Sequence, residues 1–109
     1  MTEFIHQDLA NGRWQVMTLT EQLANVGSEF ERSWSWRAKG NAQYAENALD
    51  RMLELLDLTI TDPRWQGPRL RELTRLREAV CEEWLGTTDV VPKDLSSYFL
   101  TFAVWARHG

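Results

Sequence analysis

Apolar residues recur every three to four positions after Thr18, and this spacing predicts an amphipathic helix over residues 19–39. Thr18 and Glu21 form the capping-box pattern S/T-x-x-E at its start, and Gly40 suits the left-handed position that follows many helices. At about 100° per residue the apolar side chains share one face, so Trp34 is predicted to be buried. That face consists of Leu19, Leu23, Val26, Phe30 and Trp34.

Three further helices are predicted along the chain. Asn41 is suited to cap the second, whose apolar residues cover about half its circumference and predict contacts with more than one neighbour. Pro68 suits the first turn of the third helix, and Asp94 is suited to cap the fourth. The predicted helices span residues 19–39, 42–60, 68–85 and 94–107.

Chain length and helix pattern together predict the fold. A chain of 109 residues forms one domain with a modest core. We therefore assign residues 1–109 to a single domain, with residues 1–17 as an N-terminal arm. The predicted fold class is all-α, an up-down-up-down four-helix bundle with an N-terminal extension.

Composition and charge narrow the classes of function. The formal net charge of −4 gives no general attraction to nucleic acid or to anionic lipid. A lone cysteine, Cys81, excludes an internal disulfide and fits a reducing compartment. The first residues lack a signal-peptide pattern, and no apolar run reaches the roughly 18–20 residues of a membrane span. We therefore predict a cytoplasmic protein with no membrane partner.

Motifs for catalysis are not found. The chain contains no glycine-rich phosphate loop, no G-x-S-x-G and no Cys-x-x-Cys, and His6 and His108 lie near opposite ends. The predicted inward faces hold no carboxylates of the kind that build a di-metal bundle. The sequence thus predicts no catalytic residue, no cofactor and no metal, and we interpret the protein as not an enzyme.

Arginines are dense in the segment RWQGPRLRELTRLR, where Trp65 adds an aromatic ring of the kind found on nucleic-acid-binding surfaces. One interpretation is therefore an anion or nucleic-acid contact. The preferred interpretation is ion pairing on a solvated surface with acidic residues of the second helix. The candidate contact residues are Arg64, Arg69, Arg71 and Arg75.

The third predicted helix carries its charges in the order that the helix dipole disfavours. Acidic residues are stabilising near a helix N-terminus and basic residues near its C-terminus. Here the arginines lie in the first half, and the acidic residues lie in the second half. We expect tertiary or partner contacts to offset this arrangement. The acidic residues are Glu78, Glu82 and Glu83.

Two arginines, Arg37 and Arg77, fall on apolar faces. A buried arginine needs a partner because an uncompensated buried charge is very costly. The preferred interpretation is that both bury their aliphatic stems and send their charged groups to the rim. The alternatives are an internal ion pair between Arg77 and Glu29, which would fix the helix register, and a small anion-binding pocket.

The last predicted helix is apolar nearly all round, which predicts burial on more than one side. Some of its apolar residues, and one tryptophan of the first helix, point away from the predicted core. We therefore predict a homo-oligomer, most simply a twofold dimer. The alternative is that the N-terminal arm, with Phe4, Ile5 and Trp14, covers this helix. The candidate interface residues are Trp36, Leu100, Val104 and Trp105.

Three segments, LTEQLANVGSEFERSWSWRAKGN, ALDRMLELLDLTITDPR and RLRELTRLREAVCEEWLG, resemble a family of small all-helical prokaryotic proteins of unknown function. The shared pattern is E-Q-L-x-N-V-G-S-E, then W-x-x-K-G-N and L-E-L-L-D-L-T, over about residues 18–108. It implies a helical fold and no activity. The layout is also similar to the helical partners of minimal nucleotidyltransferases. Many of those carry an arginine and a histidine a few residues apart, whereas here Arg107 directly precedes His108.

These patterns predict a non-catalytic helical accessory or scaffold protein that self-associates and binds another macromolecule, expected to be a protein of unspecified identity. The alternative is an RNA- or DNA-binding module that uses the arginines of the third helix. An enzyme of unidentified type is the third interpretation.

Overall fold

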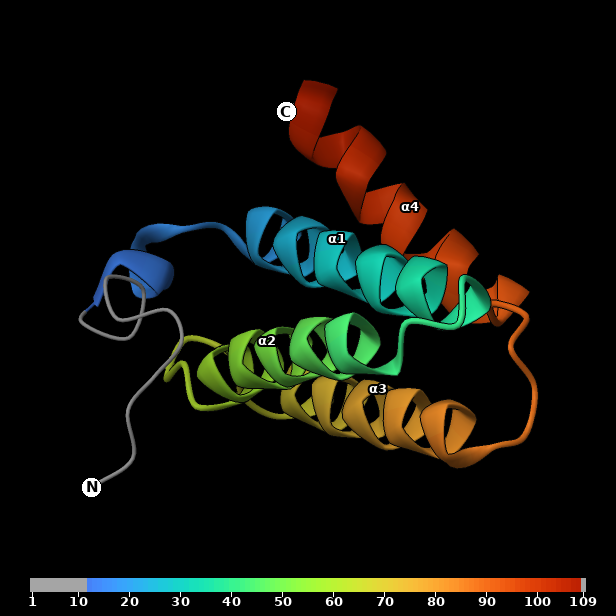
Figure 1. The fold of residues 1–109 in the computed structure, drawn as a ribbon. Coiled ribbons are helices and arrows are strands. Elements are labelled where there is room, and N and C mark those ends of the chain that lie inside the picture. Colours follow the sequence, from blue (N-terminus) through green and yellow to red (C-terminus); the bar gives the residue numbers. More distant parts are fainter. Residues whose placement is uncertain (1–11, 109) are drawn as a thin grey trace.

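The computed structural model describes residues 12–108, which form four α-helices after a short 3-10 turn (Figure 1). The predicted all-α four-helix fold is confirmed, and each helix end lies within one residue of its predicted position. The elements are η2 (Trp14–Val16), α1 (Leu19–Ala38), α2 (Ala42–Ile60), α3 (Pro68–Leu85) and α4 (Lys93–His108).

Local signals in the sequence determine where α1 and α2 begin. The backbone N–H of Glu21 donates to Thr18 Oγ1 over 3.1 Å, and the backbone N–H of Thr18 donates to Glu21 Oε1 over 3.1 Å. This reciprocal pair forms the predicted capping box. Gly40, between α1 and α2, has a φ of 78°, a conformation that favours glycine. Asn41 then caps α2 by accepting from the backbone N–H of Tyr44 over 3.0 Å.

The starts of α3 and α4 also follow from their sequences, with one correction. Pro68 occupies the first turn of α3, as predicted. Asp94 does not cap α4, because α4 begins one residue earlier, at Lys93. Asp94 therefore lies in the first turn, where its negative charge interacts favourably with the helix dipole.

Successive helices run in alternating directions, and α1 occupies the centre of the arrangement (Figure 1). The backbone of α1 approaches both α2 and α4 closely, whereas α3 packs mainly on α2. In Figure 1 α4 crosses α1 obliquely, so that its C-terminal end stands away from α1. Buried apolar side chains from all four helices form a continuous core in the described chain, including Leu23, Phe30, Met52, Leu56, Leu73 and Phe99.

A glycine in α1 determines how closely α4 approaches. A Cβ atom added at Gly27 would lie 2.7 Å from Phe99 Cβ, far inside van der Waals contact. Phe99 is 2% exposed, and its ring centroid lies 5.0 Å from that of Phe30. Because Gly27 has no side chain, α4 can place Phe99 directly against the backbone of α1.

Trp14 anchors the end of the N-terminal arm to α2. Its indole is completely buried, and Nε1–H donates to Thr59 Oγ1 over 3.0 Å. The alternative in which Trp14 covers the last helix is therefore wrong for this residue, because its indole is held at the C-terminal end of α2. The other two apolar residues of that alternative, Phe4 and Ile5, lie outside the described residues.

Candidate functional site

The outward side of α4 presents three large apolar side chains to solvent. The exposed fraction is 63% for Leu100, 41% for Val104 and 56% for Trp105. Among the described residues of α4, Phe99 alone is buried. The helix therefore packs on the core through one narrow face. Leu100 and Val104 point away from the core, in the direction that their helical spacing predicts. We call these three residues the α4 patch.

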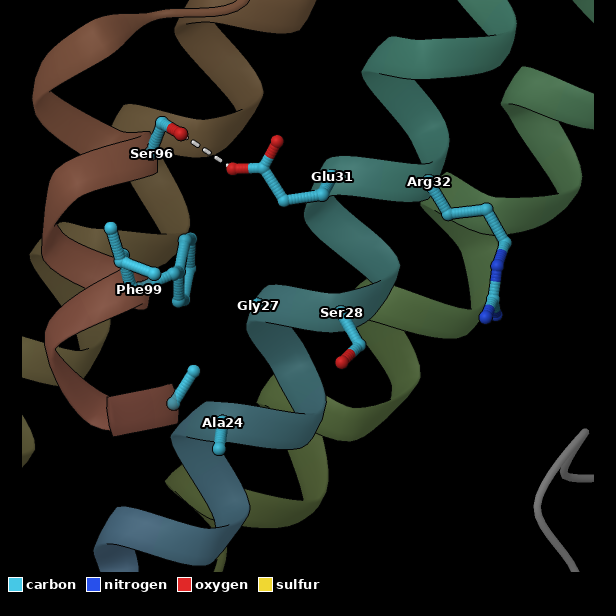
Figure 2. A pocket seen from close by; sticks show the side chains of 9 residues that line it. Ala24, Gly27, Ser28, Glu31, Arg32, Ser96 and Phe99 are labelled. Carbon is cyan, nitrogen blue, oxygen red and sulfur yellow. Dashed lines mark hydrogen bonds between the residues drawn. The ribbon is translucent and has the colours of Figure 1, made fainter. Parts of the chain in front are cut away.

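A hollow of about 510 Å³ lies between α1 and α4, beside the α4 patch (Figure 2). At one end the Ser96 hydroxyl donates to Glu31 Oε1 over 2.5 Å, the bond drawn in Figure 2. Arg32 also borders the hollow, but its guanidinium pairs with Glu29 over 2.8 Å. The walls between the two helices are formed by small and apolar side chains, so the hollow suits an apolar side chain better than a charged ligand. Those walls comprise Ala24, Gly27, Ser28, Phe99, Leu100 and Ala103.

Trp36 does not join the α4 patch. At about 100° per residue it projects from the side of α1 opposite Gly27, which faces α4. Its ring makes an edge contact with Tyr44, with centroids 4.8 Å apart, and Lys39 Nζ lies 5.1 Å from its ring centre. Trp36 is therefore half-buried by neighbouring residues of its own chain.

The four candidate arginines near Trp65 have different surroundings. Arg64 pairs with Asp62, with Nη2 and Oδ2 2.7 Å apart, and its guanidinium carbon lies 4.5 Å from the Trp65 ring centre. Arg69 lies over the same ring at 5.7 Å. Arg71 and Arg75 remain exposed and form no ion pair with any described residue.

The alternative of an internal ion pair between Arg77 and Glu29 is wrong. Arg77 Nε instead donates to Asp57 Oδ1 of α2 over 2.8 Å. Glu29 accepts from Arg32 Nη1 over 2.8 Å and from Arg51 Nε of α2 over 3.3 Å. The physical reason is the helix order: α2 packs beside both α1 and α3, so it offers Asp57 to Arg77 and Arg51 to Glu29, which also pairs with Arg32 of its own helix.

Arg37 ties the end of α1 to the end of α3. It donates to the carbonyl oxygens of Trp84 over 2.6 Å and Gly86 over 2.8 Å, and to Asp89 Oδ1 over 3.2 Å. Its guanidinium carbon lies 4.7 Å from the Trp34 ring centre and 4.8 Å from that of Trp84. The Arg37 cation lies at the C-terminus of α3, where it interacts favourably with the helix dipole. Its N–H donors are used by groups of the protein, so the alternative of an anion-binding pocket at Arg37 is not supported.

A buried polar network joins three segments, and the sequence patterns did not predict it. The Gln22 side-chain amide, 0% exposed, donates to the Trp14 carbonyl over 2.9 Å and to Asp62 Oδ2 over 3.1 Å. Trp65 Nε1–H donates back to Gln22 Oε1 over 2.9 Å. Asp62, 1% exposed, also accepts from Arg64. The network is hydrogen-bonded throughout, so we interpret it as a lock between α1, the N-terminal arm and the α2–α3 loop.

The charge of Asp62 should make this lock sensitive to acid. Hydrogen bonds from Arg64 lower the pKa of Asp62 below its ordinary 3.8, although burial opposes the shift. A carboxylate whose pKa is lowered in the folded state stabilises the fold at pH values above its unfolded-state pKa. That stabilisation is lost as pH falls through the folded-state pKa. We expect Asp62→Asn to destabilise the protein by about 1–2 kcal/mol at neutral pH. In denaturant titrations this deficit should shrink below pH 3.8, and a deficit independent of pH would contradict the assignment.

Other classes of site and the comparisons with known proteins add no assignment. Residues 12–108 contain no group of three or more His, Cys, Asp or Glu side chains placed to hold a metal ion. Across the same residues, none of the helices has the length and apolar character needed to cross a membrane. No protein-family model, curated protein or solved structure matches the chain.

Proposed function

We propose that the chain is a non-catalytic accessory or scaffold protein that self-associates and binds another protein through the α4 patch. The observation that carries this proposal is the exposure of Leu100 and Val104, which lie one helical turn apart on α4, with Trp105 exposed on the next flank, where its ring contacts Phe102. Contiguous apolar surface is uncommon on monomeric proteins and marks interaction sites. Tryptophan is also enriched among the residues that dominate binding energy at interfaces.

The hollow between α1 and α4 supports a second copy as the simplest occupant. In a twofold contact both copies use the same surface. A side chain that protrudes from each copy can therefore enter the hollow of the other. Leu100 protrudes at the edge of the hollow, and small residues such as Ala24 and Ser28 leave room there for a leucine side chain.

Sedimentation velocity tests this proposal. At high salt, where ionic contacts between copies are screened, we expect the wild type to sediment above monomer mass at tens of micromolar. Under the same conditions the double variant Leu100→Glu, Val104→Glu should sediment as a monomer, because the two introduced carboxylates would be buried in the contact without partners. Val16→Glu, Val90→Glu is the matched control, since these valines are 80% and 67% exposed outside α4. A monomeric wild type, or a double variant with wild-type mass, would contradict the proposed self-association.

Nucleic-acid binding is a second candidate, supported by the exposure of Arg71 and Arg75 without ion pairs in the described chain. If both contact phosphates, a plot of log affinity against log salt should have a slope of about −1 to −2. Titration with mixed oligonucleotides at two salt concentrations measures this slope. Binding that Arg71→Glu, Arg75→Glu leaves unchanged would remove this candidate.

A further inference from the structure

The outward face of α3 carries a charge pattern that is complementary to itself. Arg71 and Glu82 lie at equal distances from the midpoint of α3, and Arg75 and Glu78 flank the same midpoint. At about 100° per residue these four side chains share the face opposite the buried Leu73. One half of this face is therefore basic and the other half acidic. We call these four residues the α3 charge face.

Within one chain this pattern is mostly unfavourable, and only Arg75 and Glu78, opposite charges three residues apart, have a favourable spacing. All four side chains are exposed, and none forms an ion pair with another described residue. Arg71 and Arg75 are like charges four residues apart, as are Glu78 and Glu82, a spacing at which like charges destabilise a helix. Both pairs also oppose the helix dipole. Arg37 compensates the C-terminal end of α3 only in part, because it contacts carbonyl oxygens there and none of these carboxylates.

We propose that the α3 charge face pairs with the same face of a second copy in an antiparallel, twofold contact. Reversing one helix places Arg71 opposite Glu82 of the other copy and Arg75 opposite Glu78. The twofold axis forms each of these pairs twice. Every charge then meets its opposite, which relieves both the like-charge neighbours and the unfavourable order along the dipole.

A second copy fits this face better than nucleic acid does. A phosphate backbone would be attracted to Arg71 and Arg75 but repelled by the acidic half of the same face. The ends of α3 fit the twofold arrangement as well. Leu85, 84% exposed, and Pro68, also exposed, lie at equal distances from the helix midpoint, so each would meet the other across the contact.

This contact is separate from the proposed function, because it leaves the α4 patch of both copies uncovered. A chain with two different twofold surfaces can assemble beyond a dimer, as a scaffold requires. The contact is mainly ionic, so it should weaken as added salt shortens the screening length from about 10 Å at 0.1 M to about 3 Å at 1 M.

The test uses charge-reversed variants made in the Leu100→Glu, Val104→Glu chain, so that any α4 contact is already removed. One variant adds Arg71→Glu, Arg75→Glu, and the other adds Glu78→Arg, Glu82→Arg. Each variant moves two charges into line with the helix dipole but also adds a like-charge neighbour between positions 75 and 78, so circular dichroism verifies that each variant keeps its helix content. Sedimentation velocity is recorded for each variant alone and for their equimolar mixture.

We expect the parent chain to show a doubled mass at low salt and a monomer mass at high salt. Each charge-reversed variant alone should be monomeric at low salt, since like charges would face each other. Their mixture should regain the doubled mass. A parent that is monomeric at low salt, a variant that keeps the doubled mass alone, or a mixture that stays monomeric would overturn the proposal. Oligonucleotide binding by a monomeric parent would assign the arginines to nucleic acid instead.

Discussion

Replacing Trp34 by alanine should lower the free energy of unfolding by about 3–5 kcal/mol, the range for deleting a buried aromatic side chain. Trp34 is 2% exposed, and its ring centroid lies 5.4 Å from that of Trp84 and 6.5 Å from that of Phe30. The same ring supports the guanidinium of Arg37. Its loss would therefore open a cavity where α1 meets α3 and loosen the Arg37 contact. Denaturant titration followed by circular dichroism measures the change.

Trp36 provides the matched control, because it lies two positions along the same helix. It is half-buried, and its edge contact with Tyr44 is worth about 1 kcal/mol. Trp36→Ala should therefore cost much less stability than Trp34→Ala. Equal losses from the two substitutions, or a loss below about 1 kcal/mol for Trp34→Ala, would show that the buried face of α1 is assigned wrongly.

Replacing Gly27 by leucine should destabilise the protein by about 3 kcal/mol or more, because overfilling a packed contact forces the backbone to move. The first atom of the new side chain would already lie 2.7 Å from Phe99 Cβ. The substitution would otherwise favour the helix, since leucine has a higher helix propensity than glycine by somewhat under 1 kcal/mol. A loss of stability therefore reports the contact between α1 and α4 and not the helix itself.

Ser35→Leu is the control for that substitution. Ser35 also lies in α1, is exposed, and does not line the hollow between α1 and α4. The same leucine at this exposed position should change the free energy of unfolding by only about 0.5 kcal/mol. Denaturant titration compares the two variants with the wild type. If Gly27→Leu were as stable as Ser35→Leu, the close packing of α4 on α1 would be refuted.

The helices could be predicted because their boundaries depend on neighbouring residues. The capping box of Thr18 and Glu21, the left-handed Gly40 and the N-terminal Pro68 all act within a turn of the helix end. The path of α4 across α1 could not be predicted in this way. It depends on the contact between Gly27 and Phe99, which lie far apart in sequence.

The candidate site was predictable to the extent that it depends on one helix. The outward direction of Leu100 and Val104 follows from the spacing along α4. Trp36 was grouped with them because its cover, Tyr44, belongs to the next helix. The partner of Arg77 was missed for the same reason, since long charged side chains pair with the helix that packs beside them.

The buried network shows which kind of information is missing from helical spacing. Gln22 lies at the edge of the apolar face of α1, about 40° from Val26, so its position hinted at burial. Its partners are Trp14, Asp62 and Trp65, which come from the N-terminal arm and the α2–α3 loop. Only the tertiary fold brings these segments together, and the hydrogen bonds they form make burial of the amide tolerable.

The α4 patch should be covered when the protein assembles. Methyl NMR spectra recorded over a wide range of protein concentration test it residue by residue. We predict concentration-dependent shifts for the methyl groups of Leu100 and Val104, with no shifts for the fully buried Val26 and Leu56, which serve as internal controls. Leu100 and Val104 signals that stay fixed at every concentration would contradict the claim that α4 mediates self-association.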